Sequence, residues 1–102
     1  MARSEAERLY EARDVLRVDG SDNDEIILSL VRALPSYIET VTGMSEADQE
    51  NEPLCDTVRG FILRVWYYAD HADDVKLKRT IDNLLNCITV KANAIARAAA
   101  VE

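Results

Sequence analysis

Apolar residues recur along most of this chain at the three- and four-residue spacing of amphipathic helices. The clearest stripe follows Ile27, where the apolar side chains fall within about a 100° arc at 100° per residue: Leu30, Val31, Leu34, Ile38 and Val41. Gly43 stands where the C-terminal cap of this helix belongs. Pro35 interrupts the helix, but the stripe stays in phase across it, so we expect a kink and not a break.

A shorter helix is predicted near the N-terminus. Ser4 and Glu7 have the spacing of a capping box, so this helix is expected to begin after Ser4 and to run to about Arg17. Its apolar stripe is thin and is dominated by Leu9 and Leu16. Such a helix can dock on a core but cannot make one.

A third helix, from about Pro53 to Ala69, is apolar nearly all round. Pro53 suits the first helical turn. Leu63 and Tyr67 point away from the broad apolar face, so no wide polar face remains. In a chain this short the second cover can come from another subunit, which makes Leu63 and Tyr67 candidate subunit-interface residues.

A fourth helix is predicted from about Asp74 into the tail. Its apolar stripe begins at Leu77 and thins to alanines past Val90. The Ala-rich C-terminal segment, residues 92–102, has high helix propensity but only Ile95 as a large anchor. Such a tail either frays or docks against a neighbour, so Ile95 is a third candidate interface residue.

The predicted fold is all-α. We expect a single domain over residues 1–102, a small bundle of about four helices with a long, flexible acidic loop at residues 44–52 between the second and third. A hydrophobic content of 48% and a charged content of 30% are typical of a soluble helical domain. We find no membrane span and no secretory signal, and we expect the protein in a cytoplasm. Cys55 and Cys87 lack metal-site spacing and are interpreted as buried free thiols.

The net charge of −7 is concentrated in two segments. Asp19–Glu25 and Met44–Glu52 each contribute −4, which leaves the rest of the chain near +1. Such a protein is a poor general binder of nucleic acid, because affinity for phosphate comes from Lys and Arg. The second segment is a candidate channel-facing or partner-facing loop through its four carboxylates: Glu46, Asp48, Glu50 and Glu52.

The first acidic segment does not fit a calcium loop. Counting from Asp19 places Asp24 and Leu30 where Gly and Glu are required, and counting from Asp22 fails in the same way. We interpret the segment as a turn and helix cap instead. Asp19 and Gly20 form the turn, and Asp22 caps the next helix with Glu25 at the matching third position.

Few features of the sequence indicate a catalytic site. The single histidine, His71, has no Ser or Cys placed near it by local spacing. Neighbouring side chains on a turn seldom converge, so a metal site from Asp70, His71, Asp73 and Asp74 is only weakly indicated. No Gly-rich phosphate loop is present. We predict no catalytic, cofactor or metal residues and no enzyme activity.

Two short motifs flank the clearest helix. Its start follows the sequence Leu16-Arg17-Val18-Asp19-Gly20 and further acids, and its end carries Tyr37-Ile38-Glu39 and Thr42-Gly43. In these motifs the chain resembles the small head-tail connector, or adaptor, proteins of tailed bacteriophages and prophages, also called DNA-packaging proteins. The resemblance covers about Val15 to Tyr68. The chain departs from the family at Pro35 and in lacking a Pro-Phe-Gly-Val type segment after the third helix.

The resemblance implies a structural protein without enzymatic activity or cofactor. Such subunits assemble as a ring, usually dodecameric, under the portal protein at the head-tail junction of the virion. The ring accepts a stopper or tail-completion protein, and DNA passes through its channel without sequence-specific binding. Before assembly the subunit would lie in the host cytoplasm. A second hypothesis is a helical regulatory or antitoxin-like module that binds a protein partner.

Overall fold

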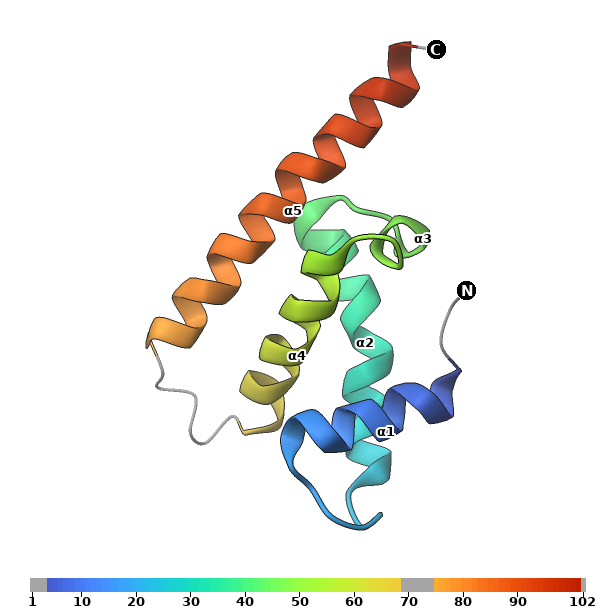
Figure 1. The fold of residues 1–102 in the computed structure, drawn as a ribbon, viewed down its shortest axis with the longest axis vertical. Coiled ribbons are helices and arrows are strands. Elements are labelled where there is room, and N and C mark those ends of the chain that lie inside the picture. The colour runs from blue at the N-terminus through green and yellow to red at the C-terminus, as the bar shows by residue number, and fades with distance from the viewer. Residues whose placement is uncertain (1–3, 69–74, 102) are drawn as a thin grey trace.

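The computed structural model describes residues 4–68 and 75–101, and all the regular structure in these two ranges is helical. Its helices are α1 (Glu5–Leu16), α2 (Asp24–Thr42), α3 (Glu46–Gln49), α4 (Pro53–Tyr67) and α5 (Val75–Val101). Figure 1 shows α2 and α4 beside each other, with α1 crossing them near one end and α5 running obliquely past them. The all-α prediction is confirmed. The expected count of about four helices did not include α3.

The predicted N-cap of α1 and the predicted C-cap of α2 are confirmed. Ser4 Oγ accepts a hydrogen bond from the Glu7 backbone N–H at 3.2 Å. α1 ends at Leu16, and Arg17 takes the left-handed conformation with φ 57°. Gly43 ends α2 with φ 83°, a conformation that glycine adopts without steric cost. α2 passes through Pro35 as one continuous helix, so it is not broken there.

The core is formed by apolar faces of α2, α4 and α5, with α1 laid against the first two. Its side chains recur at three- and four-residue spacing on each helix, as the sequence pattern predicted. Ile27 and Ile38 of α2, Val58 of α4 and Ile88 of α5 are completely buried. Burying a side chain of this size contributes roughly 1.5–3 kcal/mol.

The predicted cap at the start of α2 is wrong. α2 begins at Asp24 and its N-cap position is Asn23, whose side chain makes no capping hydrogen bond, while Asp22 is exposed in the preceding turn. Asp24 instead pairs with Arg13 of α1, which donates from Nε to Oδ1 at 2.8 Å and from Nη2 to Oδ2. Asp24 of the acidic segment therefore joins α2 to α1. The turn at Gly20, with φ 84°, is as expected.

The acidic segment 44–52 is more structured than the sequence indicated. It contains the short helix α3, and Met44 and Gln49 in it are 2% and 1% exposed. Gln49 Nε2 donates to the carbonyl oxygens of Met44 at 2.9 Å and Pro35 at 3.0 Å. A buried amide thus ties the segment to α2, which corrects the expectation of a loop without structure.

The two cysteines differ in burial. Cys55 of α4 is completely buried, with its Sγ 3.8 Å from Met44 Sδ, and burial raises the pKa of its thiol. Cys87 of α5 is exposed, so the prediction of a buried thiol is wrong at this position. Both residues are in helices, as expected.

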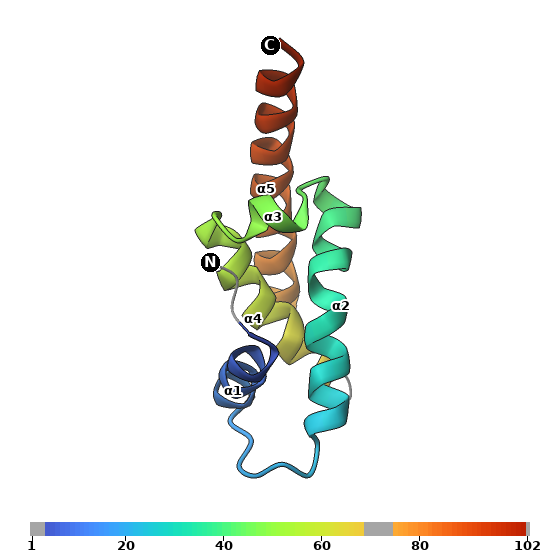
Figure 2. The ribbon, with the colours of Figure 1, turned by 90° about the vertical axis from the view of Figure 1, so that its right-hand side faces the viewer.

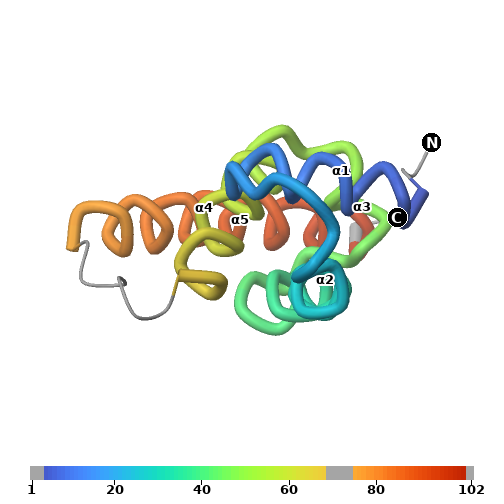
Figure 3. Tube along the Cα trace, turned by 90° about the horizontal axis from the view of Figure 1, so that it is seen from below, coloured from blue at the N-terminus to red at the C-terminus, as the bar shows by residue number. Residues whose placement is uncertain are grey.

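The described chain is elongated because α5 extends beyond the other helices. Its principal extents are 49 × 32 × 18 Å, and its radius of gyration is 14.5 Å, against about 13 Å for a compact chain of this length. Figure 2, turned by 90°, shows the C-terminal part of α5 rising alone above the other helices. Both α1 and α5 pack on α2 and α4, but over the described residues they do not pack on each other (Figure 3, seen from below).

Candidate subunit interface

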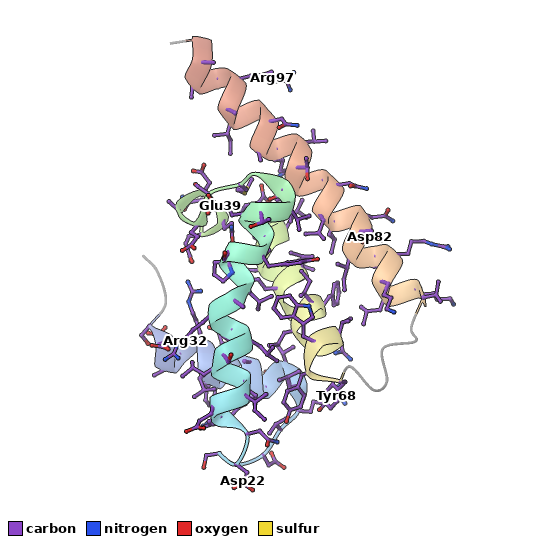
Figure 4. All side chains as sticks on the ribbon, turned by 180° about the vertical axis from the view of Figure 1, so that it is seen from behind. Asp22, Arg32, Glu39, Tyr68, Asp82 and Arg97 are labelled. Carbon is purple, nitrogen blue, oxygen red and sulfur yellow. The ribbon has the colours of Figure 1, made fainter. Side chains whose placement is uncertain are left out.

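The C-terminal part of α5 leaves the bundle while remaining helical. α5 contributes Ile81, Leu85, Ile88 and Ala92 to the core. From Asn93 to Ala100 every side chain is exposed. We call residues 93–100 the α5 arm; Figure 4 labels Arg97 on it, far from Asp22 at the opposite end of the molecule. The predicted helical tail is thus confirmed as a helix over the residues described.

The core-facing stripe of α5 continues into the α5 arm. Ile95 follows Ala92 by three residues and Ala99 follows Ile95 by four, which is the spacing of the buried positions before them. Ile95 is 44% exposed, and the nearby Val90 is 64% exposed. An apolar stripe that extends beyond the bundle of its own chain is typical of a surface that another chain covers.

The other two candidate interface residues do not lie on an open surface. Leu63 is 4% exposed and belongs to the core. Tyr67 is half-buried, and its hydroxyl oxygen accepts a hydrogen bond from Asn23 Nδ2 at 2.7 Å. The second apolar side of α4 does require cover, as predicted, but in this chain α1 and the turn after it provide that cover.

Gly60 is the sequence signal that reveals this packing. It lies in the middle of α4, where glycine costs about 1 kcal/mol relative to alanine. A Cβ at Gly60 would lie 3.8 Å from Val15 Cγ1 of α1. A small residue inside an otherwise apolar helix thus marks the side on which α1 approaches. Farther along, the Tyr68 hydroxyl donates to the Leu16 carbonyl oxygen at 2.7 Å, which holds the end of α1 against α4.

The four carboxylates of the second acidic segment have different surroundings. Glu50 pairs with Arg8 of α1 at 2.5 Å, and Glu52 pairs with Lys91 of α5 at 2.9 Å. Glu46 is exposed and Asp48 is half-buried, both in α3. Half of the candidate partner-facing charge is therefore engaged within the chain.

Glu52 also caps α4. Its Oε2 accepts a hydrogen bond from the Leu54 backbone N–H at 3.0 Å. The hydrogen bond from Lys91, and after it the one from Leu54, hold the pKa of the Glu52 carboxyl below its ordinary value. Glu52 thereby links α4 to α5 one residue before Ala92, the last core position before the α5 arm.

The structure does not bring the two acidic segments together. The Asp19–Glu25 segment forms the turn at one end of the molecule, while α3 lies toward the end from which the α5 arm projects. In the first segment Asp19, Asp22 and Glu25 are exposed. These three are the carboxylates of that segment that remain open to solvent.

Charge is divided between α5 and the rest of the bundle. α5 carries five basic residues and one acidic residue, a net charge of +4. Residues 4–68 carry six arginines and fourteen acidic residues, a net charge of −8. The helix that projects from the molecule is therefore opposite in charge to the body that holds it.

Residues 4–68 and 75–101 contain no group of three or more His, Cys, Asp or Glu side chains that could hold a metal ion. Asp70, His71, Asp73 and Asp74, weighed above as a metal site, lie outside the described residues. No helix in the described ranges is long and apolar enough to cross a membrane. Comparison with protein-family models, curated proteins and solved structures yields no match for the chain.

Proposed function

We propose that this protein is a non-enzymatic head-tail connector, or adaptor, subunit of a tailed bacteriophage or prophage. In this role it assembles as a ring under the portal protein and links the DNA-filled head to the tail. The observation that carries the proposal is the α5 arm, whose apolar stripe continues past Ala92 with no cover from its own bundle. A subunit built for assembly needs such a surface.

The division of charge supports assembly into a ring. A cyclic ring requires a heterologous interface, in which two different patches of each subunit meet. The α5 arm, whose one charged residue is Arg97, and residues 4–68, with a net charge of −8, are two such patches, and their opposite charges favour contact between neighbours. In this arrangement Ile95 docks on the next subunit.

The family-like motifs have structural roles that a shared fold would preserve. Arg17 takes the left-handed conformation that ends α1, and Gly20 makes the turn that follows. Ile38 is completely buried in the core, and Gly43 ends α2. The resemblance in these residues therefore concerns positions that set the course of the backbone.

The exposed carboxylates suit a channel through which DNA slides. Acidic side chains repel phosphate, so DNA passes without sequence-specific binding. In the second segment Glu50 and Glu52 form ion pairs with α1 and α5, so Glu46 and Asp48 are the better candidates to face the channel or a stopper or tail-completion protein. Replacing both by Gln and Asn and finding unchanged assembly and DNA retention would count against this role.

The proposal is tested by binding to the portal protein encoded near this chain. We expect the purified protein and portal to co-elute in size-exclusion chromatography, and Ile95→Asp to abolish co-elution by preventing ring closure. Val75→Ser is the matched control, because Val75 is a 65% exposed apolar residue at the other end of the same helix. Absence of co-elution with the wild-type protein would count against the proposal.

A second candidate is a regulatory or antitoxin-like module that covers a basic partner. The acidic charge of residues 4–68 favours this alternative specifically. Neighbouring genes distinguish the two roles, since portal, protease and capsid genes support the connector and a small toxin gene supports the module.

A further inference from the structure

A cavity lies between α1, α2 and α4, on the side of α4 that α1 covers. Its volume is about 220 Å³, and its floor is apolar, formed by Val31, Leu34 and Leu63. Gly60 contributes to its wall, and a Cβ there would lie 3.8 Å from Cγ1 of Val15, another lining residue. A 150 Å³ apolar cavity can hold a benzene ring, so this one has room for an aromatic side chain.

The wall of the cavity carries unused hydrogen-bond donors. Arg59 donates from Nη1 to Asp56 Oδ1 at 2.9 Å. Its Nε and Nη2 are buried and have no hydrogen-bond partner among the described residues. Buried donors are rarely left without an acceptor, because desolvation without a replacement bond is costly. These two atoms form one edge of the guanidinium plane, which can donate to an oxygen placed beside it.

The charges around the cavity favour a neutral occupant. Arg8 and Arg59 are balanced by Glu11 and Asp56 on the same walls. An anion would meet two carboxylates, and a cation would meet two guanidinium groups. An apolar ring that carries one hydroxyl fits better, because the ring contacts the floor and the hydroxyl oxygen can accept from Arg59.

The chain presents such a group elsewhere on its own surface. Tyr10 of α1 is 73% exposed, more than any other large hydrophobic residue described. At 100° per residue it lies nearly opposite Ala12, which lines the cavity from the same helix. The protruding phenol and the cavity are therefore two different patches on two sides of α1.

We propose that the cavity receives the Tyr10 side chain of a second copy of this chain. The phenol ring packs on Leu34 and Leu63, and its hydroxyl accepts a hydrogen bond from Arg59. Because the patch and the cavity are different surfaces, the contact is head-to-tail and leaves both a free tyrosine and a free cavity for further copies. The contact rests on the proposed ring, for which it supplies a second point of contact beside the α5 arm.

Sedimentation velocity over a concentration series tests this contact. We expect self-association of the wild-type protein, and Tyr10→Ala to weaken it about tenfold or more, as for a buried aromatic anchor. Tyr10→Phe keeps the ring and should weaken association only several-fold. Gly60→Leu fills the cavity and should match Tyr10→Ala, and Arg59→Met provides a second cavity variant if Gly60→Leu does not fold. Val75→Ser is the control that should associate like the wild type.

Mixing the variants gives the sharpest result. Tyr10→Ala retains the cavity and Gly60→Leu retains the tyrosine, so we expect their equimolar mixture to form a dimer that neither forms alone. A wild-type protein that stays monomeric throughout, or a Tyr10→Ala variant that associates like the wild type, would overturn the proposal. Binding to the portal protein is a separate readout, so the connector role can fail while this contact stands, and the reverse.

Discussion

Lys91 Nζ of α5 lies 2.9 Å from Glu52 Oε1 at the start of α4. The Glu52 side chain is 13% exposed, while that of Lys91 is 51% exposed. Because Ala92 is the last α5 residue in the core, this ion pair stands where the α5 arm leaves the bundle. It fixes the base of the surface that we assign to assembly.

Substitutions of Glu52 should separate its two roles. Glu52→Ala removes both the cap of α4 and the ion pair, and we expect the free energy of unfolding to fall by about 1–2 kcal/mol. Glu52→Gln keeps an acceptor for the Leu54 N–H, so it should lose only about 0.2–1 kcal/mol. Urea denaturation followed by circular dichroism measures both. Equal losses in the two variants would show that the cap contributes nothing.

The Glu52 contribution should depend on pH in a defined direction. The carboxyl has a lowered pKa in the folded chain, so its stabilisation is present above its unfolded pKa and is lost as the pH falls through its folded pKa. We expect the difference in unfolding free energy between the wild type and Glu52→Gln to shrink through the acidic range. A difference that grows on acidification would contradict the assignment.

Leu63 and Ile95 should respond in opposite ways to truncation. Leu63→Ala opens a cavity in the core and should destabilise the chain by about 2–5 kcal/mol. Ile95→Ala changes an exposed side chain and should alter stability by at most about 0.5 kcal/mol while impairing ring assembly. Thermal unfolding and electron microscopy of assemblies provide the two readouts. A large loss of stability in Ile95→Ala would contradict the picture of an uncovered α5 arm.

Gln49 should be important for the structure of the segment 44–52. Gln49→Ala leaves the carbonyl oxygens of Pro35 and Met44 without the bonds from its amide, and we expect a loss of about 1–3 kcal/mol. Glu46→Ala in the same short helix is the control, because Glu46 is exposed. Hydrogen exchange should be slow at amides of this segment in the wild type and in Glu46→Ala, and fast in Gln49→Ala. Fast exchange in the wild type would restore the interpretation of a flexible loop.

The two thiols should differ in reactivity. Cys87 is exposed and should react rapidly with a thiol reagent in the native protein, whereas Cys55 is buried and its pKa is raised, so little thiolate forms. Absorbance measured with Ellman's reagent should therefore show one fast thiol, and none in Cys87→Ser until denaturant is added. Two fast thiols in the native protein would contradict the packing of Cys55 against Met44.

Helical periodicity was sufficient to predict most of the fold. Val31, Leu34 and Ile38, for example, are buried as expected, because the apolar face of an amphipathic helix packs toward the hydrophobic core. Caps at Ser4 and Gly43 were also predictable, since they depend on residues adjacent in sequence.

Interactions between distant residues account for what the sequence did not predict. Asp22 was predicted to cap α2, but Asp24 is the carboxylate that has a structural role, because it pairs with Arg13 and links α2 to α1. From the sequence alone, Gln49 is expected at the surface. Its burial depends on the carbonyl groups of Pro35 and Met44, which lie beside it only in the folded chain. Leu63 was correctly predicted to need cover. Whether α1 or another subunit covers it depends on how closely α1 packs against α4, and Gly60 is the one sequence signal of that packing. The interface role of Ile95 remains a prediction, because the partner proposed for it is another chain.

Electron microscopy of the protein mixed with a portal protein encoded beside it tests whether the subunit assembles as a ring at the portal. We expect ring-shaped density below the portal, with the α5 arm of each subunit against the bundle of the next. Ile95→Asp should abolish that density, and Val75→Ser should retain it. Portal particles that carry no added density with the wild-type protein would contradict the connector assignment.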